Sequence, residues 1–233
     1  MVPLNQSPEG TLWRSTAIGG GDVSQVAAKL LAPDLDADRW RRRWTAQAEL
    51  VAGLGGEGCI SAASIFLGAV PHRAGAATGP ARSLYAVTPW VPGRTFAAWC
   101  ADGSLGMSDR TAVLADLART VERLGDRGIV HRDLSPGNVI VDGTTATVID
   151  FGIAIRVGDD VRSDRHLGTE GFAAPETSGG TWSPAADRWS FGALCRLAVG
   201  PGDNESVHRF IDRLLSDRPD DRPPPTDIPR TDL

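Results

Sequence analysis

The stretch that decides the fold is HRDLSPGNVIVDGTTATVIDFG, residues 131–152. Its two apolar, β-branched runs, NVIV and TATVID, flank DGTT, and this pattern predicts an antiparallel hairpin that turns at residues 142–143. Such a hairpin brings Asn138, at the start of one run, beside Asp150, at the end of the other. An amide oxygen beside a carboxylate suits Mg²⁺, which binds a few protein oxygens and fills its octahedron with water and phosphate. Asp133, on the loop before the hairpin, is placed to orient a hydroxyl near the metal.

The residues before this stretch predict a strand-rich front half. TLWRSTAI and SQVAAKLL flank a GGGD turn and predict a hairpin, while CISAASIFLGAV and SLYAVTPWV predict two more strands separated by a loop. Between these pairs, residues 34–54 predict a long helix that begins at Asp-rich caps and ends at Gly-Gly. Its RWRRRW segment, residues 39–44, has two interpretations: a solvated face whose arginine stems cover apolar groups, or a docking surface for an acidic partner.

The back half is predicted to be helical beyond Gly93. SDRTAVLADLARTVERLGDRG has apolar residues at helical spacing, with Ser108 as its cap and Gly125 or Gly128 at its end. SPAADRWSFGALCRLAVG and ESVHRFIDRLLSD predict two more helices. The tail is rich in Pro and Asp, and we expect it to fray after Arg222.

Composition and charge exclude several classes of protein. A net charge of −5 at pH 7 and a pI near 5.4 argue against a general nucleic-acid binder, which usually carries a basic domain. The three cysteines lack metal-ligand spacing, so neither a zinc site nor a disulfide framework is expected. No leader pattern begins the chain and no apolar run is long enough to cross a bilayer. We therefore expect one globular, cytoplasmic protein with no membrane partner.

Five motifs follow one another along the chain: HRDLSPGN, DFG, GTEGFAAPE, DRWSFG and LLSDRPDDRP. They resemble, in the same order, the catalytic loop, the metal-binding turn, the end of the activation segment, the DxWSxG helix and the closing helix of protein kinases of the eukaryotic type, as found widely in bacteria. The resemblance runs from residue 4 to residue 223. A composition rich in Gly, Ala, Arg and Asp is also typical of a GC-rich bacterial source.

This resemblance implies an α+β, two-lobed protein-kinase-like fold. Residues 1–91 are expected to form a small β-rich lobe with the nucleotide loop, the lysine strand and one long regulatory helix. Residues 92–233 are expected to form a mainly helical lobe with the catalytic loop, the activation segment and the helical core. The segment between Asp187 and Arg222 holds too few residues for one further helix, which in the family docks protein substrates and regulators.

The resemblance also implies the roles of four residues. Asp133 would accept or orient the substrate hydroxyl, Asn138 and Asp150 would hold Mg²⁺, and Lys29 of VAAK would bridge the α- and β-phosphates of ATP. Lys29 is the only lysine among 24 basic side chains. Because a compact ammonium and a planar guanidinium are not interchangeable in a confined site, a phosphate-binding role explains why a lysine is kept here.

Supporting roles follow from the same resemblance. Arg132 would receive a charge on the activation segment, and Thr169 would face the catalytic loop. Asp187 would tie the catalytic-loop backbone to the helical core, and Glu176 would pair with Arg222. These residues would serve the scaffold and its regulation.

The hinge of the resemblance is LYAVTPWVPG. Thr88 takes the gatekeeper position, where it leaves a roomy back pocket, and adenine would bind the carbonyl group of Pro89 and the N–H and carbonyl groups of Val91. Proline lacks an N–H but keeps its carbonyl, so Pro89 removes nothing that this arrangement requires.

The nucleotide loop departs from the family pattern. NQSPEGTL, residues 5–12, keeps only Gly10 of the three glycines, and Pro8 has no N–H to donate to phosphate. We therefore expect a looser hold on ATP. The chain starts at this loop, so we expect either that most of the first strand is absent or that the true start codon lies upstream.

Two further departures concern charge near the phosphates. Gln47 stands where the family has the glutamate that pairs with Lys29, and Glu49 faces away unless the helix is shifted. Ser135 replaces a lysine of the catalytic loop, which removes a positive charge beside the γ-phosphate. Ser163 is the only hydroxyl between DFG and GTEG, so switching by autophosphorylation would depend on it.

Three functions stay open on this basis. One is a Mg-ATP-dependent phosphotransferase acting on Ser/Thr hydroxyls of protein, and the second is a pseudokinase that serves as a nucleotide-binding scaffold or regulator. The third is a kinase for a small molecule or a modified peptide. The joint presence of Lys29, Asp133, Asn138 and Asp150 favours activity. The implied partners are ATP, Mg²⁺ and a protein substrate or regulator.

Overall fold

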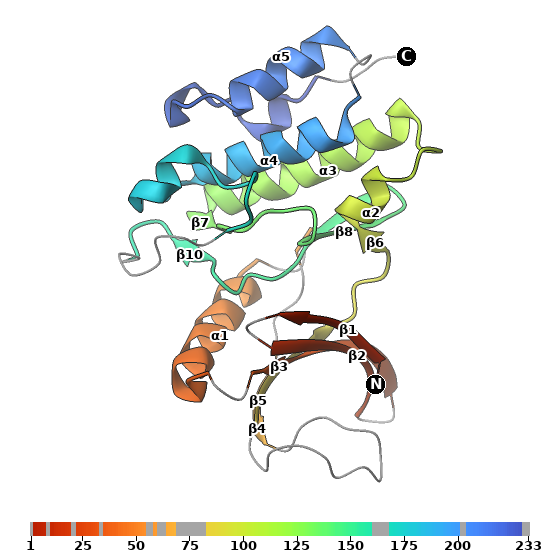
Figure 1. The fold of residues 1–233 in the computed structure, drawn as a ribbon, viewed down its shortest axis with the longest axis vertical. Helices are drawn as coiled ribbons and strands as arrows, with labels where there is room; N and C mark the ends of the chain where they lie inside the picture. The colour runs from red at the N-terminus through yellow and green to blue at the C-terminus, as the bar shows by residue number, and fades with distance from the viewer. Residues whose placement is uncertain are drawn as a thin grey trace. The chain divides into compact units, whose positions relative to one another are not determined.

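The structure is a computed structural model of the chain that describes residues 2–7, 10–19, 22–32, 35–54, 58–59, 64–68, 83–159, 168–200 and 204–229. The chain divides into two compact units, whose elements are drawn in Figure 1. Residues 1–56 and 60–91 form the first unit, and residues 57–59 and 92–233 form the second.

The described part of the first unit is built on a five-stranded antiparallel sheet with the order β1-β2-β3-β5-β4 (Figure 1). Its strands are β1 (Val2–Ser7), β2 (Gly10–Gly19), β3 (Asp22–Leu31), β4 (Ser64–Gly68) and β5 (Ser83–Pro89). The hairpin predicted around GGGD is confirmed, because β2 and β3 pair along their length out to Gly19 and Asp22. The two later strands are confirmed as well.

The expectation that most of the first strand is absent was wrong. β1 pairs with β2 from Val2 to Ser7, with one irregularity between Pro3 and Asn5. Strand pairing uses backbone N–H and C=O groups, so a short segment with few β-branched residues can still join the edge of a sheet. The three residues NQS, assigned to the nucleotide loop, lie in this strand.

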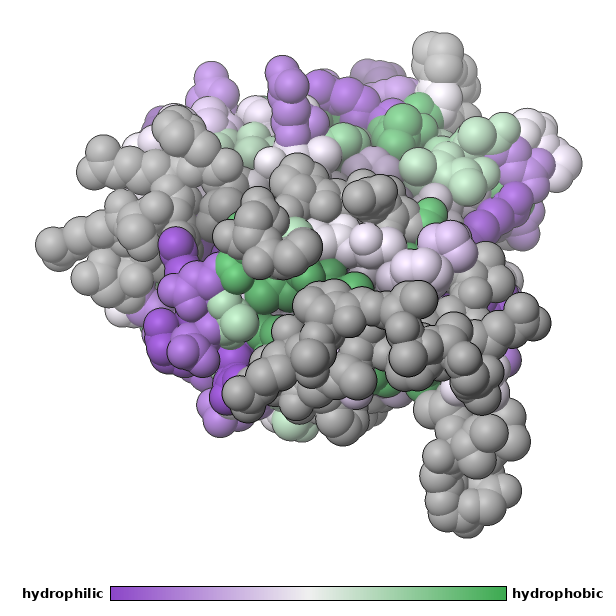
Figure 2. Space-filling model, turned by 60° about the horizontal axis from the view of Figure 1, so that its bottom comes forward, coloured by the Kyte–Doolittle hydropathy of each residue, from purple (hydrophilic) through white to green (hydrophobic). Residues whose placement is uncertain are grey.

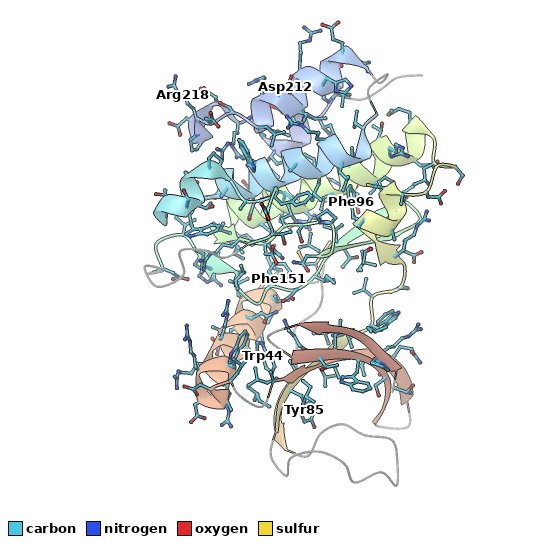
Figure 3. All side chains as sticks on the ribbon, viewed as in Figure 1. Trp44, Tyr85, Phe96, Phe151, Asp212 and Arg218 are labelled. Atoms are coloured by element: carbon cyan, nitrogen blue, oxygen red, sulfur yellow. The ribbon has the colours of Figure 1, made fainter. Side chains whose placement is uncertain are left out.

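Helix α1 (Ala37–Ala52) lies within the predicted helix and packs against the sheet of the first unit. Asp36 caps it: its Oδ1 accepts the N–H groups of Asp38 at 3.0 Å and Arg39 at 3.1 Å. Trp44 points from α1 toward the sheet (Figure 3), where it forms a buried cluster with Leu31 and Leu84. The helix is therefore stabilised by a cap at its start and by an apolar face.

The arginine-rich segment of α1 combines exposed arginines with one that lies over an aromatic ring, and the choice between a solvated face and a docking surface stays open. Arg43 lies over the Trp40 ring, 4.9 Å from its centre, so its charge covers an aromatic group of the same helix. Arg39 and Arg42 are exposed, and their charges add to the backbone hydrogen bond from Arg39 in lowering the pKa of Asp36. Acidic groups at the start of the helix thus offset part of the basic charge.

In its described residues, the second unit combines two small sheets with four α-helices (Figure 1). One sheet has the order β6-β8-β9, and the other pairs β10 with β7. The strands are β6 (Arg94–Thr95), β7 (Ile129–Val130), β8 (Val139–Asp142), β9 (Thr145–Val148) and β10 (Ile155–Arg156). The α-helices are α2 (Phe96–Cys100), α3 (Met107–Asp126), α4 (Pro184–Ala198) and α5 (Glu205–Leu214), and the 3₁₀ turns are η1 (Pro175–Gly179), η2 (Pro219–Asp221) and η3 (Pro225–Asp227).

Helices α3 and α4 lie side by side and form the centre of the second unit (Figure 1). Helix α4 buries residues over most of its circumference, and Phe191 and Leu194 on it are inaccessible to solvent. The apolar stripe predicted for α3 is buried, including Leu117 and Val121. The three predicted helices of the back half are thus confirmed, and α4 is the element against which the others pack.

Two local boundaries differ from prediction. Helix α3 begins at Met107 with Gly106 as its N-cap, so Ser108 is not the cap. The Asp109 carboxylate accepts the N–H of Gly106 at 3.2 Å and closes this end of the helix. In the central hairpin Asp142 still pairs with Thr145, so the turn is formed by residues 143–144, one position later than predicted.

The prediction that the tail frays after Arg222 was also wrong. Pro223, Pro225 and Ile228 are buried, and η3 packs against α3. The composition of this segment is typical of a flexible tail. The free energy gained by burying these apolar side chains compensates for the conformational entropy that the segment loses when it becomes ordered. The described part of the tail extends to residue 229.

The surface of the described residues is mixed in character. Figure 2 shows hydrophilic residues beside smaller apolar areas on the face that it draws. Among the described residues, the large apolar side chains that are well exposed are Leu4 on β1, Leu197 on α4 and Val157 in the turn after β10, so they lie far apart in the sequence. Among the helices of the described part, none combines the length and the apolar character needed to cross a bilayer.

Candidate active site

The loop between β7 and β8 is held in place by a buried carboxylate on α4. Asp187 accepts the backbone N–H of His131 at 2.6 Å and that of Arg132 at 3.1 Å. Burial raises the pKa of Asp187, and the backbone N–H groups of His131 and Arg132 and the charge of Arg132 act against this shift. Asp187 therefore joins the backbone of this loop to helix α4.

Backbone strain is concentrated around the predicted chemistry. Arg132 and Asp150 have φ values of 70° and 58°, and they are the non-glycine residues in the described part of the chain with positive φ. This left-handed region is costly for residues with a Cβ, so it persists only where surrounding contacts impose it. Arg132 directly precedes Asp133, and Asp150 is itself one of the residues assigned to hold Mg²⁺.

The Asp133 carboxylate is fixed by a donor on each oxygen. Asn138 Nδ2 donates to Oδ2 at 2.8 Å, and Thr169 Oγ1 donates to Oδ1 at 2.7 Å. The same Asn138 nitrogen donates to the Asp133 carbonyl oxygen at 2.9 Å. Two predicted site residues, Asn138 and Thr169, thus set the orientation of the half-buried carboxylate of a third, Asp133.

The central hairpin brings Asn138 next to the residue before Asp150. The Ile149 N–H donates to the Asn138 carbonyl oxygen at 2.9 Å, so Asp150 follows directly after this contact, just beyond the end of β9. Asp150 is exposed, and its Oδ1 accepts the Gly152 N–H at 3.2 Å. With its amide nitrogen engaged by Asp133, Asn138 retains its side-chain oxygen Oδ1 as the atom for a cation.

This donor set fits Mg²⁺. A carboxylate and an amide oxygen are hard ligands of the kind that Mg²⁺ takes from proteins, with water and phosphate in the other positions. Within the described ranges no three His, Cys, Asp or Glu side chains form a cluster for a metal ion. Asp150 and Asn138 would therefore hold the cation together with a phosphate group rather than in an all-protein cage.

Phe151 anchors the segment that carries Asp150. It is fully buried (Figure 3), and its ring meets that of His131 edge-on at 4.7 Å between centres. His131 Nδ1 accepts the Asp133 N–H at 3.3 Å, so the proton lies on Nε2, which is 3.1 Å from the Ile149 carbonyl oxygen. One histidine ring thus connects the backbone on both sides of the site.

Lys29 lies on the face of its sheet that α1 covers. Side chains two residues apart on a strand share a face, and Leu31 on β3 packs against Trp44 of α1. Lys29 is half-buried and lies opposite Leu12 on β2 and Ala86 on β5. It belongs to the first unit, whereas Asp133, Asn138 and Asp150 belong to the second.

Gln47, not Glu49, lies on the inner stripe of α1. Residues 44, 47 and 51 follow one another at helical spacing, and both Trp44 and Val51 are buried. Gln47 is half-buried, whereas Glu49 is exposed. The register of α1 thus agrees with the assignment of Gln47 to the position of the family glutamate, and its pairing with Lys29 stays a prediction.

The predicted hinge residues lie at the end of β5 in the first unit. Thr88 is half-buried and pairs with Ala27, while Pro89 pairs with Val26 and is exposed. Val91 is half-buried and ends the first unit. Their contacts with adenine stay a prediction.

The residues assigned to regulation have different outcomes. Ser163 lies outside the described residues. Arg132 is buried, and its guanidinium lies over the ring of Trp182. Ser135 is buried too, and its carbonyl oxygen accepts the Asn138 N–H at 3.0 Å, so it closes the turn before β8. The contribution of Trp182 was missed, since no local pattern connects it to residues 50 positions away.

Glu176 and Arg222 form a two-pronged ion pair. Nη1 and Nη2 of Arg222 donate to the two carboxylate oxygens at 2.6 and 2.8 Å. Arg222 is 2% exposed and also donates to the carbonyl oxygens of Ala185 and Ser216. This pair joins η1 to the segment after η2 within the helical unit.

More than half of the chain matches a known protein family. The sequence profile described as the protein kinase domain matches residues 73–201, more than half of the chain. The chain belongs to the protein kinase domain family. The catalytic-loop carboxylate, the hairpin and the buried Glu176–Arg222 pair all lie in the α+β fold of a kinase domain with an antiparallel sheet in its first unit.

Several relatives of this kinase domain carry serine/threonine kinase names. A probable serine/threonine-protein kinase zyg-1 of Caenorhabditis briggsae is 38% identical over 97 residues, which is 40% of this chain and 14% of that protein. A putative serine/threonine-protein kinase F31E3.2 of Caenorhabditis elegans is 31% identical over 142 residues, 55% of this chain and 32% of that protein. The serine/threonine-protein kinase AtPK1/AtPK6 of Arabidopsis thaliana is 38% identical over 82 residues, 34% of this chain and 18% of that protein.

The kinase domain therefore aligns with less than a third of each of these relatives. All three are eukaryotic proteins, so a bacterial source for this chain stays a prediction.

Proposed function

We propose that the chain is a Mg-ATP-dependent phosphotransferase that phosphorylates Ser/Thr hydroxyls of proteins. The observation that carries the proposal is the Asp133 carboxylate, held between Asn138 and Thr169 at 2.8 and 2.7 Å. Such a carboxylate is oriented in advance for a hydroxyl that approaches it. The names of the relatives support the choice of Ser/Thr as the acceptor.

In the proposed reaction the substrate hydroxyl oxygen forms a bond to the γ-phosphorus as the bond to the ADP oxygen breaks. The hydroxyl proton passes to Asp133, whose two hydrogen-bond donors keep the carboxylate pointing at the incoming oxygen. A bound Mg²⁺ would neutralise phosphate charge. Asn138 Oδ1 and the Asp150 carboxylate would supply its protein ligands, and Lys29 would position the α- and β-phosphates.

The proposal assigns the two lobes to separate tasks. Residues 1–91 would bind the nucleotide through Gly10, the Lys29 strand and the hinge from Thr88 to Val91. Residues 92–233 would carry the catalytic loop, the activation segment and the binding surface for a protein substrate or regulator.

The first experiment is the intact mass of the purified protein after incubation with Mg-ATP, beside Asp133→Asn. Wild type is expected to gain phosphate or to release ADP, and Asp133→Asn is not, because the substituted amide cannot accept the hydroxyl proton. Asp150→Ala is expected to abolish transfer as well, since it removes the charged metal ligand. Equal activity of wild type and both variants would contradict the proposal.

A nucleotide-binding pseudokinase is the second candidate, and the register of α1 favours it. Gln47 on the inner stripe would hydrogen-bond Lys29 without neutralising it, whereas Glu49 is exposed. This candidate predicts that ATP raises the Tm while no ADP appears above the level of Asp133→Asn. In that case a Lys29→Met strain would retain its phenotype.

A kinase for a small molecule or a modified peptide is the third candidate. Within the described part, α5 is the one α-helix between α4 and the closing segment at Arg222. This candidate predicts ADP release stimulated by a metabolite fraction and not by protein. Labelling of serines in a generic basic protein would count against it.

A further inference from the structure

The buried cation of Arg132 is held by an aromatic face. Its guanidinium carbon lies 4.3 Å from the centre of the Trp182 ring, and Nη1 donates to the carbonyl oxygen of Ile153 at 3.3 Å. Arg132 is 3% exposed. A guanidinium removed from water needs compensating contacts, and the face of an indole ring provides one of the strongest that an uncharged group can offer.

This contact bears directly on the backbone next to Asp133. Arg132 has a φ of 70°, a conformation that a residue with a Cβ keeps only when its surroundings impose it. Asp187 holds the backbone from one side through the Arg132 N–H at 3.1 Å, and Trp182 holds the side chain at its far end. One peptide bond joins Arg132 to Asp133, so the conformation of Arg132 sets the position of the Asp133 backbone.

We propose that Trp182 is a positioning residue for Asp133 and acts through Arg132. The inference rests on the proposed phosphotransferase function, because its effect is on transfer from ATP. Trp182 lies just before α4, the helix whose Asp187 holds the same loop, so one region of the helical core secures both the backbone and the side chain of Arg132.

The indole acts here through its face and not through its N–H. Trp182 Nε1 is buried, and it has no hydrogen-bond partner in the part of the chain that the structure describes. A ring without that N–H is therefore expected to serve nearly as well. Trp182→Phe keeps an aromatic face, whereas Trp182→Leu keeps apolar bulk and removes the face that attracts a cation.

Trp189 provides a matched control. Its ring also lies under a buried arginine, with the Arg222 guanidinium carbon 5.1 Å from its centre. Arg222 pairs with Glu176 and makes no contact with the catalytic loop among those described. Trp189→Leu thus removes an equivalent contact at a site that has no part in orienting Asp133.

The test measures kcat and KM for ATP by ADP release, with the Asp133→Asn rate subtracted, together with the Tm of each variant. Trp182→Leu is expected to lower kcat about tenfold, as a small displacement of a reacting group does, with KM for ATP within about twofold of wild type. Trp182→Phe is expected to restore most of kcat. Trp189→Leu is expected to lower Tm without a comparable loss of kcat.

The Arg132→Gln variant keeps the test decisive if Trp182→Leu does not fold. Arg132→Gln removes the cation and leaves Trp182 in place, and it is expected to lower kcat by a similar factor. Where both single variants fold, the kcat of the double variant should be no lower than that of the slower single variant, because the two side chains act as one unit.

The possible results separate the two proposals. An unchanged kcat in Trp182→Leu or in Arg132→Gln, or equal impairment of Trp182→Phe and Trp182→Leu, overturns the positioning role while the phosphotransferase function stands. If wild type releases no more ADP than Asp133→Asn, the proposed function is overturned and the positioning role with it.

Discussion

Gly10 occupies a position at which a side chain would collide with the next strand. A Cβ built there would lie 1.8 Å from the Leu30 carbonyl oxygen, and φ is 149°. The residue is buried at the start of β2, where its backbone pairs with Leu31. At the residue scale, this contact explains why the loop motif retains this glycine while Asn5 and Ser7 replace the other two.

Gly10→Ala is expected to lower the free energy of unfolding by about 1–3 kcal/mol, because both the Leu30 carbonyl and the backbone conformation oppose a Cβ. Chemical denaturation of the purified protein measures the effect. Gly103→Ala is the control, since a Cβ there meets no atom within 4 Å. Its stability should stay within about 0.5 kcal/mol of wild type. Similar results for the two variants would contradict the assigned collision.

The cysteine thiols are expected to be unreactive in the folded protein. Burial raises the pKa of Cys59 and of Cys100 to about 11 and raises that of Cys195 further. A raised thiol pKa means that the reactive thiolate is scarce at pH 8, and its fraction grows only as the pH approaches the shifted value. A thiol-titrating reagent at pH 8 should label the native protein slowly and all three cysteines quickly in denaturant. Fast labelling of the native protein would contradict this.

At the scale of elements, the ends of helices and the tail are set by contacts with neighbours. The α3 cap is Gly106 with Asp109 because the loop before the helix turns at that point, although Ser108 is the better cap by residue type. The central hairpin turns one residue later than predicted because Asp142 still pairs across the ladder. Element existence follows from periodicity, whereas each end depends on which backbone groups find partners.

The tail is expected to contribute to stability through η3 and its flanks. Ile228→Ala removes a side chain that is 8% exposed, and we expect the free energy of unfolding to fall by about 2 kcal/mol. Thr226→Ala, at an exposed position in η3, is the control and should change it by less than about 0.5 kcal/mol. Denaturant titration followed by tryptophan fluorescence measures both. Equal stability of Ile228→Ala and wild type would mean that the tail does not pack as described.

At the scale of the whole molecule, long-range polar contacts tie distant parts of the second unit together. Asp187 on α4 holds the loop before β8, and Glu176 after the GTEG segment holds Arg222 near the end of the chain. Each contact joins segments more than 40 residues apart. Because these groups are buried, removing one of them leaves its partner with neither a hydrogen bond nor contact with water.

Glu176→Gln is expected to lower the free energy of unfolding by about 3 kcal/mol, because the buried Arg222 guanidinium loses its counter-charge. The matched control is Glu205→Gln, which removes an exposed i,i+4 pair with Arg209 at 3.7 Å. That change should amount to about 0.5 kcal/mol or less. Thermal and chemical unfolding of both variants measure the difference. A loss as small in Glu176→Gln as in Glu205→Gln would show that the buried pair adds little.

The sequence by itself determined the hairpin of β2 and β3, strands β4 and β5, helices α1, α3, α4 and α5, the central hairpin, and the spacing that brings Asn138 close to Asp133. These features depend on periods of two or 3.6 residues and on groups only a few positions apart, so they are readable locally. Only the tertiary structure decided the ring that covers Arg132, the burial of the tail and the strand before Gly10. Each of those depends on the summed burial and hydrogen bonding of segments that meet only when the chain is packed, and no local pattern records such a sum.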